Sequence, residues 1–276
     1  MILIAGGTGT LGTPLVNGLV ARGAAVRVLT RHENRAIELR ARGIEAVVGD
    51  VRDTAAIATA VVGCATVITA IQGFSSGRGN SPASIDRDAN IALIDAVIEA
   101  GGDHLILVSA YGASPTHPMS LHRMKFAAEQ ALRSSSLHWT IIRPTAYLET
   151  WSGLIGAQLP DRGRALVFGP GDNPINFVRV TDVVAAVERA VYDDSQRDRI
   201  IEVVGSEDLT FNQIAGILTA AIETPTTTDH IPLFALRALS ILARPIAPAF
   251  ARKAHAAAIM NTTNMSVDRT GAAPAR

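Results

Sequence analysis

The chain has 276 residues, of which 48% are apolar and 18% charged. This composition supports one large domain or two small ones with a sizeable core, and it argues against disorder. The 25 basic and 25 acidic residues balance, and no basic stretch stands out, so we expect neither nucleic acid nor a membrane as a partner.

Cys64 is the single cysteine, which excludes a disulfide framework within the chain and a cysteine-based metal site. We expect a buried, inert thiol and no metal. The first residues already form a strand rather than a signal peptide, and the longest apolar stretch, Ile231 to Ile246, is interrupted by Arg237 and Arg244. These features predict a cytoplasmic protein.

The first twelve residues, MILIAGGTGTLG, carry the main functional signal. Ile2 to Ala5 predict a buried strand, and apolar residues recur at helical spacing after Gly12. Gly6 and Gly7 allow a tight turn with positive φ, Gly9 lets a phosphate approach the backbone, and Gly12 lets the helix pack closely. The free N–H groups at the start of the helix favour an anion. We expect the pyrophosphate of a dinucleotide at Gly6, Gly9 and Gly12, with backbone N–H groups from Thr8, Thr10 and Leu11.

The end of the second expected strand, Val26 to Thr30, bears on the choice of cofactor. Sites for NAD usually carry an acidic residue about 20 residues beyond the glycines. Here Arg31 follows the strand, and Arg35 can add to its charge. A charge-assisted bond to a 2′-phosphate contributes about 1.5–3 kcal/mol, so we expect NADP(H), with NAD(H) binding more weakly. The alternative for Arg31 is a solvated side chain.

The third expected strand, Ala46 to Val48, follows a helix over Asn34 to Arg42. Asp50, just past this strand, is placed to accept a bond from the adenine amino group, and Val51 frames the ring. Asp53 is expected to cap a helix over residues 54–62.

The fourth expected strand, Thr66 to Ile71, brings Thr69 and Ala70 to the same edge of the sheet, where we expect them to contact the cofactor. A glycine- and serine-rich loop, Phe74 to Ser81, is the expected rim of the site. Further alternating elements are expected as a helix from Ser81 and Pro82 to Ala100, a strand over 104–109, a helix over 119–133 and a strand over 139–142. The alternation predicts an α/β protein with a Rossmann-type, doubly wound parallel sheet.

The remaining chain predicts a smaller lobe. Glycine and proline become frequent after Ala146, followed by a helix from Val180, a strand over 200–204 and a helix over 209–221. Residues 262–276 resemble a frayed tail. We therefore assign residues 1–150 to an NAD(P)-binding core and 151–276 to a substrate-covering lobe, with 176–204 returning to the core sheet.

These motifs resemble the atypical short-chain dehydrogenase/reductase superfamily and, within it, the NmrA-like branch. The likeness covers most of residues 1–191 and rests on GGTGTLG, LTRHENR, GDVRD, MKFAAEQALRSSSLHWTIIRPTAYLE and FVRVTDVVAAVERAV. It implies a Rossmann core that binds NAD(P), with Pro144 near the nicotinamide and Lys125 near its ribose. Asp182 matches a recurring aspartate, which we interpret as a helix N-cap.

One position departs from the superfamily. Its dehydrogenases use a tyrosine four residues before the lysine as the proton donor, and here that position is Leu121. Lys125 is one candidate acid, as the related isoflavone-reductase type implies, or it is only a ribose anchor. Glu129, one helical turn on, can hold its ammonium or be solvated.

Tyr111 is a second candidate acid, or a packing residue of its loop, and Ser109 falls where the superfamily often places a catalytic serine. We expect His117 and His122, which flank the same region, at the surface.

Two functions remain open. The first is reduction of a small quinone, azo compound or enone, because such products ask less of a protein acid. The second is a non-catalytic NADP(H) sensor acting through a protein partner, as the resemblance also allows; an epimerase is disfavoured by the missing tyrosine. Residues 231–260 are expected as core or dimer-facing helix, so a homodimer is compatible with the sequence.

Overall fold

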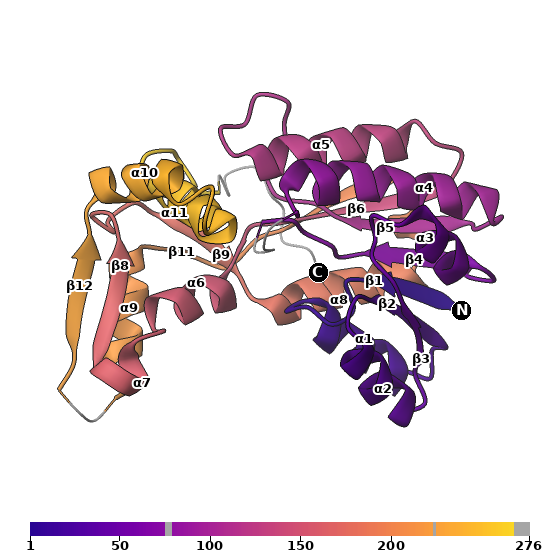
Figure 1. Cartoon of the computed structure of the whole chain (residues 1–276), viewed down its shortest axis with the longest axis horizontal. Coiled ribbons are helices and arrows are strands. Elements are labelled where there is room, and N and C mark those ends of the chain that lie inside the picture. The colour runs from indigo at the N-terminus through magenta and orange to yellow at the C-terminus, as the bar shows by residue number, and fades with distance from the viewer. Residues whose placement is uncertain (75–78, 223–224, 268–276) are drawn as a thin grey trace. The chain divides into compact units, whose positions relative to one another are not determined.

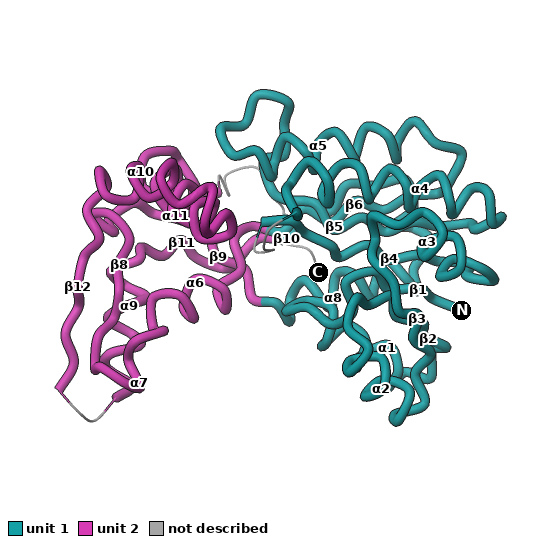
Figure 2. The backbone as a smooth tube through the Cα atoms, in the orientation of Figure 1, with its two compact units in different colours: residues 1–144, 180–203 teal, residues 145–179, 204–276 magenta. Residues whose placement is uncertain are grey.

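The computed structural model describes residues 1–74, 79–222 and 225–267. Part of the loop expected at Phe74–Ser81, residues 75–78, and the last part of the expected tail, 268–276, lie outside the described residues. The chain forms two compact units (Figure 2). Unit 1 comprises residues 1–144 and 180–203, and unit 2 comprises 145–179 and 204–276.

Unit 1 is built on a seven-stranded parallel sheet in the order β10-β6-β5-β4-β1-β2-β3. Its strands are β1 (Ile2–Ala5), β2 (Val26–Thr30), β3 (Glu45–Val48), β4 (Thr66–Thr69), β5 (His104–Val108), β6 (His138–Pro144) and β10 (Arg199–Val203). The expected fold class is thus confirmed. The chain leaves β1 toward β2 and β3, then returns to β4 on the other side of β1. This reversal opens the carboxyl edge between β1 and β4, where sheets of this type bind ligands.

Helices cover both faces of the sheet (Figure 1). On one face α1 packs against α8, and on the other α4 packs against α3 and α5. The helices of unit 1 are α1 (Gly12–Ala21), α2 (Glu33–Ala41), α3 (Thr54–Val61), α4 (Asn90–Glu99), α5 (Ser120–Arg133) and α8 (Val180–Tyr192), with a short 3₁₀ turn, η2 (Asp194–Gln196). With both faces covered, the strands are rich in β-branched and leucine residues.

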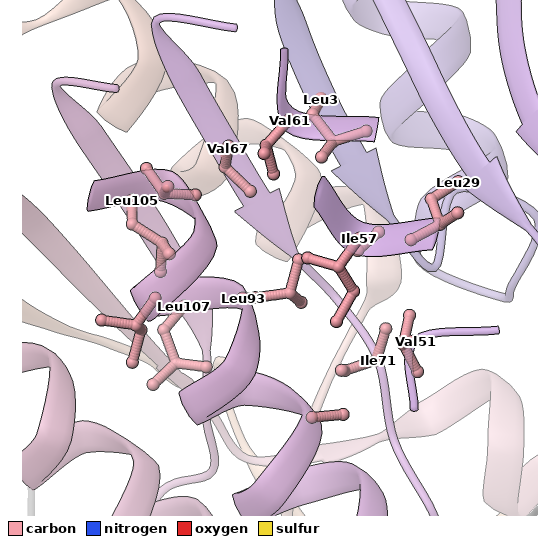
Figure 3. Packing of buried hydrophobic residues seen from close by; sticks show 14 of the residues in the cluster. Leu3, Leu29, Val51, Ile57, Val61, Val67, Ile71, Leu93, Leu105 and Leu107 are labelled. Carbon is pink, nitrogen blue, oxygen red and sulfur yellow. The ribbon is translucent and has the colours of Figure 1, made fainter. Parts of the chain in front are cut away.

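The core on the α3–α5 side contains fully buried side chains from strands and helices, among them Leu3, Ile57, Val67, Leu93 and Leu105 (Figure 3). Cys64 belongs to this cluster and is buried and free, as expected, and burial raises the pKa of its thiol. This packing fixes the strand ends that carry the site.

Two helix starts differ in outcome. Asp53 caps α3 by accepting a bond from the N–H of Ala55, as predicted. The prediction that Asp182 is an N-cap is wrong, because α8 begins at Val180 and Asp182 lies inside its first turn. A carboxylate there still suits the positive end of the helix dipole.

The helix expected from Pro82 to Ala100 begins with a π-helical segment, η1 (Pro82–Ala89), and continues as α4. Ser81 caps it, as expected, in a reciprocal capping box with Ser84. A π-helical turn is uncommon and often occurs at a functional site. Here it determines which residues face the sheet edge.

Unit 2 contains two small sheets, β11-β9-β7 and β12-β8. Its core includes Trp151, Phe168, Phe177 and Phe211, whose ring centroids lie 5.1–6.2 Å apart in the contacting pairs. Its elements are β7 (Ala146–Tyr147), α6 (Leu148–Ile155), α7 (Leu159–Arg162), β8 (Arg164–Phe168), β9 (Ile175–Val178), β11 (Asp208–Leu209), α9 (Phe211–Ala220), β12 (Thr227–Ile231), α10 (Leu233–Leu242) and α11 (Pro248–Met260). Its assignment as a substrate cover stays a prediction. Within the described residues, no helix has the length and apolarity that crossing a bilayer requires.

Candidate active site

The turn between β1 and α1 is closely packed. Gly6 adopts a φ of +88°, and a Cβ there would lie 2.8 Å from the carbonyl oxygen of Ala70. The expectation of a positive φ is wrong for Gly7, which needs to be small because a Cβ there would lie 2.8 Å from the Val28 side chain. A Cβ on Gly12 would lie 2.0 Å from the carbonyl oxygen of Gly6, so any larger residue would displace the turn. Gly12 therefore has the packing role expected of it, and Gly6 places the end of β1 against the end of β4.

The same turn offers an anion site. Gly9 and Thr10 are exposed, Thr8 is half-buried, and a Cβ on Gly9 would meet only the Gly6 carbonyl, at 3.4 Å. Within the described chain, the N–H groups of Thr10, Leu11 and Gly12 donate no hydrogen bond. Unpaired donors at a helix N-terminus beside an open backbone fit a pyrophosphate.

Charged residues lie at the ends of β2 and β3. Arg31 is exposed and forms no ion pair with another described residue, whereas Arg35 pairs with Glu38 at 2.7 Å. Asp50 is held by Arg52 through Nε at 2.9 Å and Nη2 at 2.8 Å, and these bonds, more than the charge of Arg31, keep the pKa of its carboxyl low. Arg31 is thus available for a phosphate, while the Asp50 carboxylate already has a partner.

Two other predicted contact residues turn their side chains inward. Val51 is buried in the core near Ile71 (Figure 3). Thr69 is fully buried and donates from Oγ1 to Asn90 Oδ1 at 2.6 Å. Their side chains are therefore committed to the core, and their predicted contacts with the cofactor would have to come from the backbone.

Lys125 lies on the buried face of α5 with Ala128. Its ammonium is 2.9 Å from the carbonyl oxygen of Ile71 and 3.2 Å from Asp86 Oδ1. The side chains of Lys125 and Asp86 are 4% and 0% exposed, and Asp86 Oδ2 accepts a bond from the N–H of Gly73 at 2.9 Å. Because Ile71 follows Ala70, this ion pair lies beside the strand end that contacts the glycine turn.

Glu129 does not hold Lys125, so that alternative and the solvated one are both wrong. The side chain is fully buried and accepts bonds from Ser109 Oγ and from Arg143, at 3.0 Å from Nε and 2.5 Å from Nη2. This carboxylate raises the pKa of the Arg143 guanidinium. Ser109 lies at the expected place, but its hydroxyl proton is directed to Glu129 rather than to an open site.

Tyr111 and Pro144 are brought together at the carboxyl edge, because the N–H of Tyr111 donates to the carbonyl oxygen of Pro144 at 2.8 Å. Tyr111 is half-buried. The structure leaves its role as an acid a prediction.

The expectation of surface histidines is wrong for His122, which is buried, while His117 is half-buried. Their rings stack with centroids 3.8 Å apart. Burial lowers the pKa of both, that of His122 to about 3, so both are neutral at pH 7. A neutral His122 beside the apolar core avoids the cost of a buried charge.

Sequence reasoning missed Asp86 and the true partners of Glu129. A signal for Asp86 was present: Asp86 and Asn90 lie four residues apart in a helix that otherwise buries Ile85 and Ala89. Two polar residues on such a face predict a buried polar contact.

The comparisons with known proteins agree with this geometry. An NAD(P)H-binding family profile matches residues 6–165, which include the glycine turn, Lys125 and Pro144. This chain belongs to the NAD(P)H-binding family. The expected nicotinamide dinucleotide and the expected membership of an NAD(P)-binding family are thereby confirmed.

Several relatives of this NAD(P)H-binding protein are reductases. It is 30% identical to a (4-alkanoyl-5-oxo-2,5-dihydrofuran-3-yl)methyl phosphate reductase of Streptomyces griseus, over 92% of this chain and 86% of the other. It is 26% identical to an NAD(P)H azoreductase of Xenophilus azovorans, over 82% and 75%. It is also 27% identical to the photosystem II assembly factor Ycf39 of Synechocystis, over 86% and 72%.

Solved structures share the fold. The triphenylmethane reductase of Citrobacter sp., complexed with NADP(H), superposes with a TM-score of 0.77 at 18% identity, over 98% of this chain and 92% of the other. The NADPH-dependent quinone oxidoreductase QOR2 of Escherichia coli gives 0.75 at 24% identity, over 96% and 92%. At these identities the likeness supports the architecture alone.

Proposed function

We propose that the protein is an NADP(H)-dependent oxidoreductase that reduces a small organic acceptor of the azo, quinone or enone type. The observation that carries the proposal is the Lys125–Asp86 ion pair buried beside the strand ends that contact the glycine turn. Relatives that reduce an azo compound and an unsaturated lactone support this acceptor class.

The residues of unit 1 divide the binding task. Backbone N–H groups of Thr10, Leu11 and Gly12 would hold the pyrophosphate, and Arg31 the 2′-phosphate. When bound, NADPH supplies the hydride. An ammonium has three N–H donors, so Lys125 keeps at least one for a ribose hydroxyl after its contacts with Ile71 and Asp86. Pro144 is placed near the nicotinamide by the family resemblance alone.

Asp86 favours the anchor role of Lys125 over the role of proton donor. If Lys125 gave up its proton, the carboxylate of Asp86 would remain buried without its counter-charge, which is strongly unfavourable. The acceptor is therefore protonated by water or by Tyr111. This assignment suits azo, quinone and enone acceptors, whose reduced products do not require a strong protein acid.

The test combines calorimetric NADPH binding with NADPH oxidation in the presence of an azo dye, a quinone and an unsaturated lactone. We expect turnover with at least one acceptor. We expect Lys125→Met to weaken NADPH binding by about ten- to a hundredfold, because a charge-assisted bond contributes about 1.5–3 kcal/mol, while turnover at saturating NADPH falls less. A collapse of turnover with unchanged NADPH affinity would instead make Lys125 the proton donor.

The second candidate function is an NADP(H) sensor that acts through a protein partner. Leu121 in place of the usual tyrosine and the commitment of the Ser109 hydroxyl to Glu129 favour it, and several relatives are named as assembly factors rather than enzymes. Tight NADPH binding without turnover on any acceptor would support this function.

A further inference from the structure

Helix α10 of unit 2 is apolar on two opposite sides. Leu236 and Ser240 are buried on one side. Phe234, Ile241 and Leu242 project from the other, with exposed fractions of 76%, 61% and 71%. At 3.6 residues per turn, positions 234, 238 and 241 lie opposite 236 and 240. Exposed apolar side chains gathered on one side of a helix are a common mark of an interaction surface.

The surface continues beyond the helix. Ile246 and Phe250 follow Leu242 at intervals of four residues and are 80% and 46% exposed. Phe250 belongs to α11, which packs against α10. We call these five side chains, Phe234, Ile241, Leu242, Ile246 and Phe250, the α10–α11 apolar patch. α10 therefore contributes only one side to the core, α11 buries its alanine-rich face, and the expectation of a core or dimer-facing helix stays a prediction.

The chain segment that carries the patch has formal charges of one sign only. Residues 230–267 contain no aspartate or glutamate, although the whole chain has a net charge of zero. The same segment contains Arg237 and Arg244, both exposed, and further along Arg252 and Lys253. Large apolar side chains beside arginines, with no acid in the segment, are complementary to an apolar layer bounded by anions.

We propose that the α10–α11 apolar patch docks on the surface of an anionic lipid membrane. The apolar side chains enter the boundary between headgroups and acyl chains, and Arg237 and Arg244 contact lipid phosphates. A symmetric dimer through this patch fits less well, because it would bring the arginines of both copies into one interface with no acid in the segment to pair them. The proposal does not depend on the proposed catalytic function.

The expectation of no membrane partner rested on the absence of a spanning segment and of a basic stretch. An interfacial helix needs neither, because it lies in the membrane plane and buries one face only. α10 has ten residues, too few to span a bilayer but enough to present three turns.

The test is flotation of the full chain with vesicles of phosphatidylcholine plus phosphatidylglycerol, and with vesicles of phosphatidylcholine alone. We expect binding to the anionic vesicles that weakens in high salt, and at least tenfold weaker binding to the neutral ones. No binding to anionic vesicles at low salt would overturn the proposal.

Variants distinguish binding through the patch from nonspecific hydrophobic binding. The double variant Phe234→Ser/Leu242→Ser is expected to lower the partition coefficient about tenfold or more, because two large apolar side chains no longer leave water. Ile217→Ser is the matched control, since Ile217 is 62% exposed on α9 of the same unit, and it should bind like the parent. Equal binding by the double variant, or loss of a dimer in that variant by light scattering, would contradict lipid docking.

Discussion

Lys125 and Asp86 form an ion pair in which both side chains are buried, with exposures of 4% and 0%. Removing one partner of such a pair leaves an uncompensated buried charge. We therefore expect the contributions of Lys125 and Asp86 to the free energy of unfolding to depend strongly on each other.

A double-mutant cycle with Asp86→Asn and Lys125→Met measures this dependence. Each single variant is expected to lower the free energy of unfolding by about 3–5 kcal/mol, and the double variant by clearly less than the sum. Urea unfolding gives the values. The exposed Arg40–Glu33 pair of unit 1 is the control, with an expected coupling of about 0.2–1 kcal/mol. A coupling for Lys125–Asp86 no larger than this would show that the buried pair is not formed.

Arg31 is the residue that selects between the two dinucleotides in this account. We expect Arg31→Ala to weaken NADPH binding by about ten- to a hundredfold and to change NADH binding little, because only NADPH carries the 2′-phosphate. Calorimetric titration with both dinucleotides measures the difference. Arg35→Ala, which breaks only the exposed pair with Glu38, serves as the control. An equal loss for NADPH and NADH would remove Arg31 from the phosphate site.

The role of a residue can be predicted from the sequence when it depends on neighbouring residues in the chain. It is predicted less well when it depends on partners that are distant in the chain. Asp53 and Ser81 are caps, which a few neighbouring residues determine. Glu129 binds Ser109, which directly follows β5, and Arg143, which lies on β6. These two residues come close to Glu129 only when the sheet has formed. No spacing along α5 distinguishes that arrangement from a contact with Lys125.

At the scale of elements, the tight glycine turn makes its own prediction. Gly12→Ala places a methyl carbon 2.0 Å from the carbonyl oxygen of Gly6, which is closer than van der Waals contact allows, so the turn must move. We expect the loss of most dinucleotide binding, measured by NADPH titration, with a smaller loss of stability. Gly216→Ala in α9 is the control, because a Cβ there meets nothing within 4 Å. Unchanged NADPH affinity in Gly12→Ala would contradict the assignment of the glycine turn as the pyrophosphate site.

Two buried histidines link stability to pH. Burial lowers the pKa of His104, which contacts Thr140 across β5 and β6, to about 4, and that of His122 to about 3. Their unfolded pKa is about 6.5, so below that value the unfolded state binds more protons than the folded state. Stability contributed by the neutral rings is present above pH 6.5 and is lost as pH falls.

We expect the free energy of unfolding to fall by up to about 1 kcal/mol per pH unit for each histidine between pH 6 and 4. Urea unfolding at several pH values measures the slope. His122→Phe should make the slope shallower. An unchanged slope in His122→Phe would show that the ring is not buried and neutral.

The strands and helices of residues 1–144 follow from apolar runs and alternation, because a sheet buried on both faces leaves a clear pattern. The π-helical start at Pro82–Ala89, which packs against α5, could not be predicted, since residue propensities do not distinguish a π-helical from an α-helical hydrogen-bonding register. In unit 2, β7 and β11 have two residues each and pair with β9, and such short strands carry no periodic signal.

At the scale of the whole molecule, the order of the strands explains why one edge holds every candidate residue. The reversal between β1 and β4 places the glycine turn, Ile71 and the Lys125–Asp86 pair at neighbouring strand ends. Family membership establishes the nicotinamide dinucleotide.

The most direct measurement is transfer of deuterium from NADPH labelled at C4, in each of its two configurations, to an azo, quinone or unsaturated lactone acceptor, followed by mass spectrometry of the products. We predict that one labelled form is oxidised with transfer of its deuteride to an acceptor. The label is retained where it becomes bound to carbon, as in a reduced lactone, because deuterium bound to oxygen or nitrogen exchanges with water. NADPH that binds tightly but is not oxidised with any acceptor would contradict the reductase and leave the sensor.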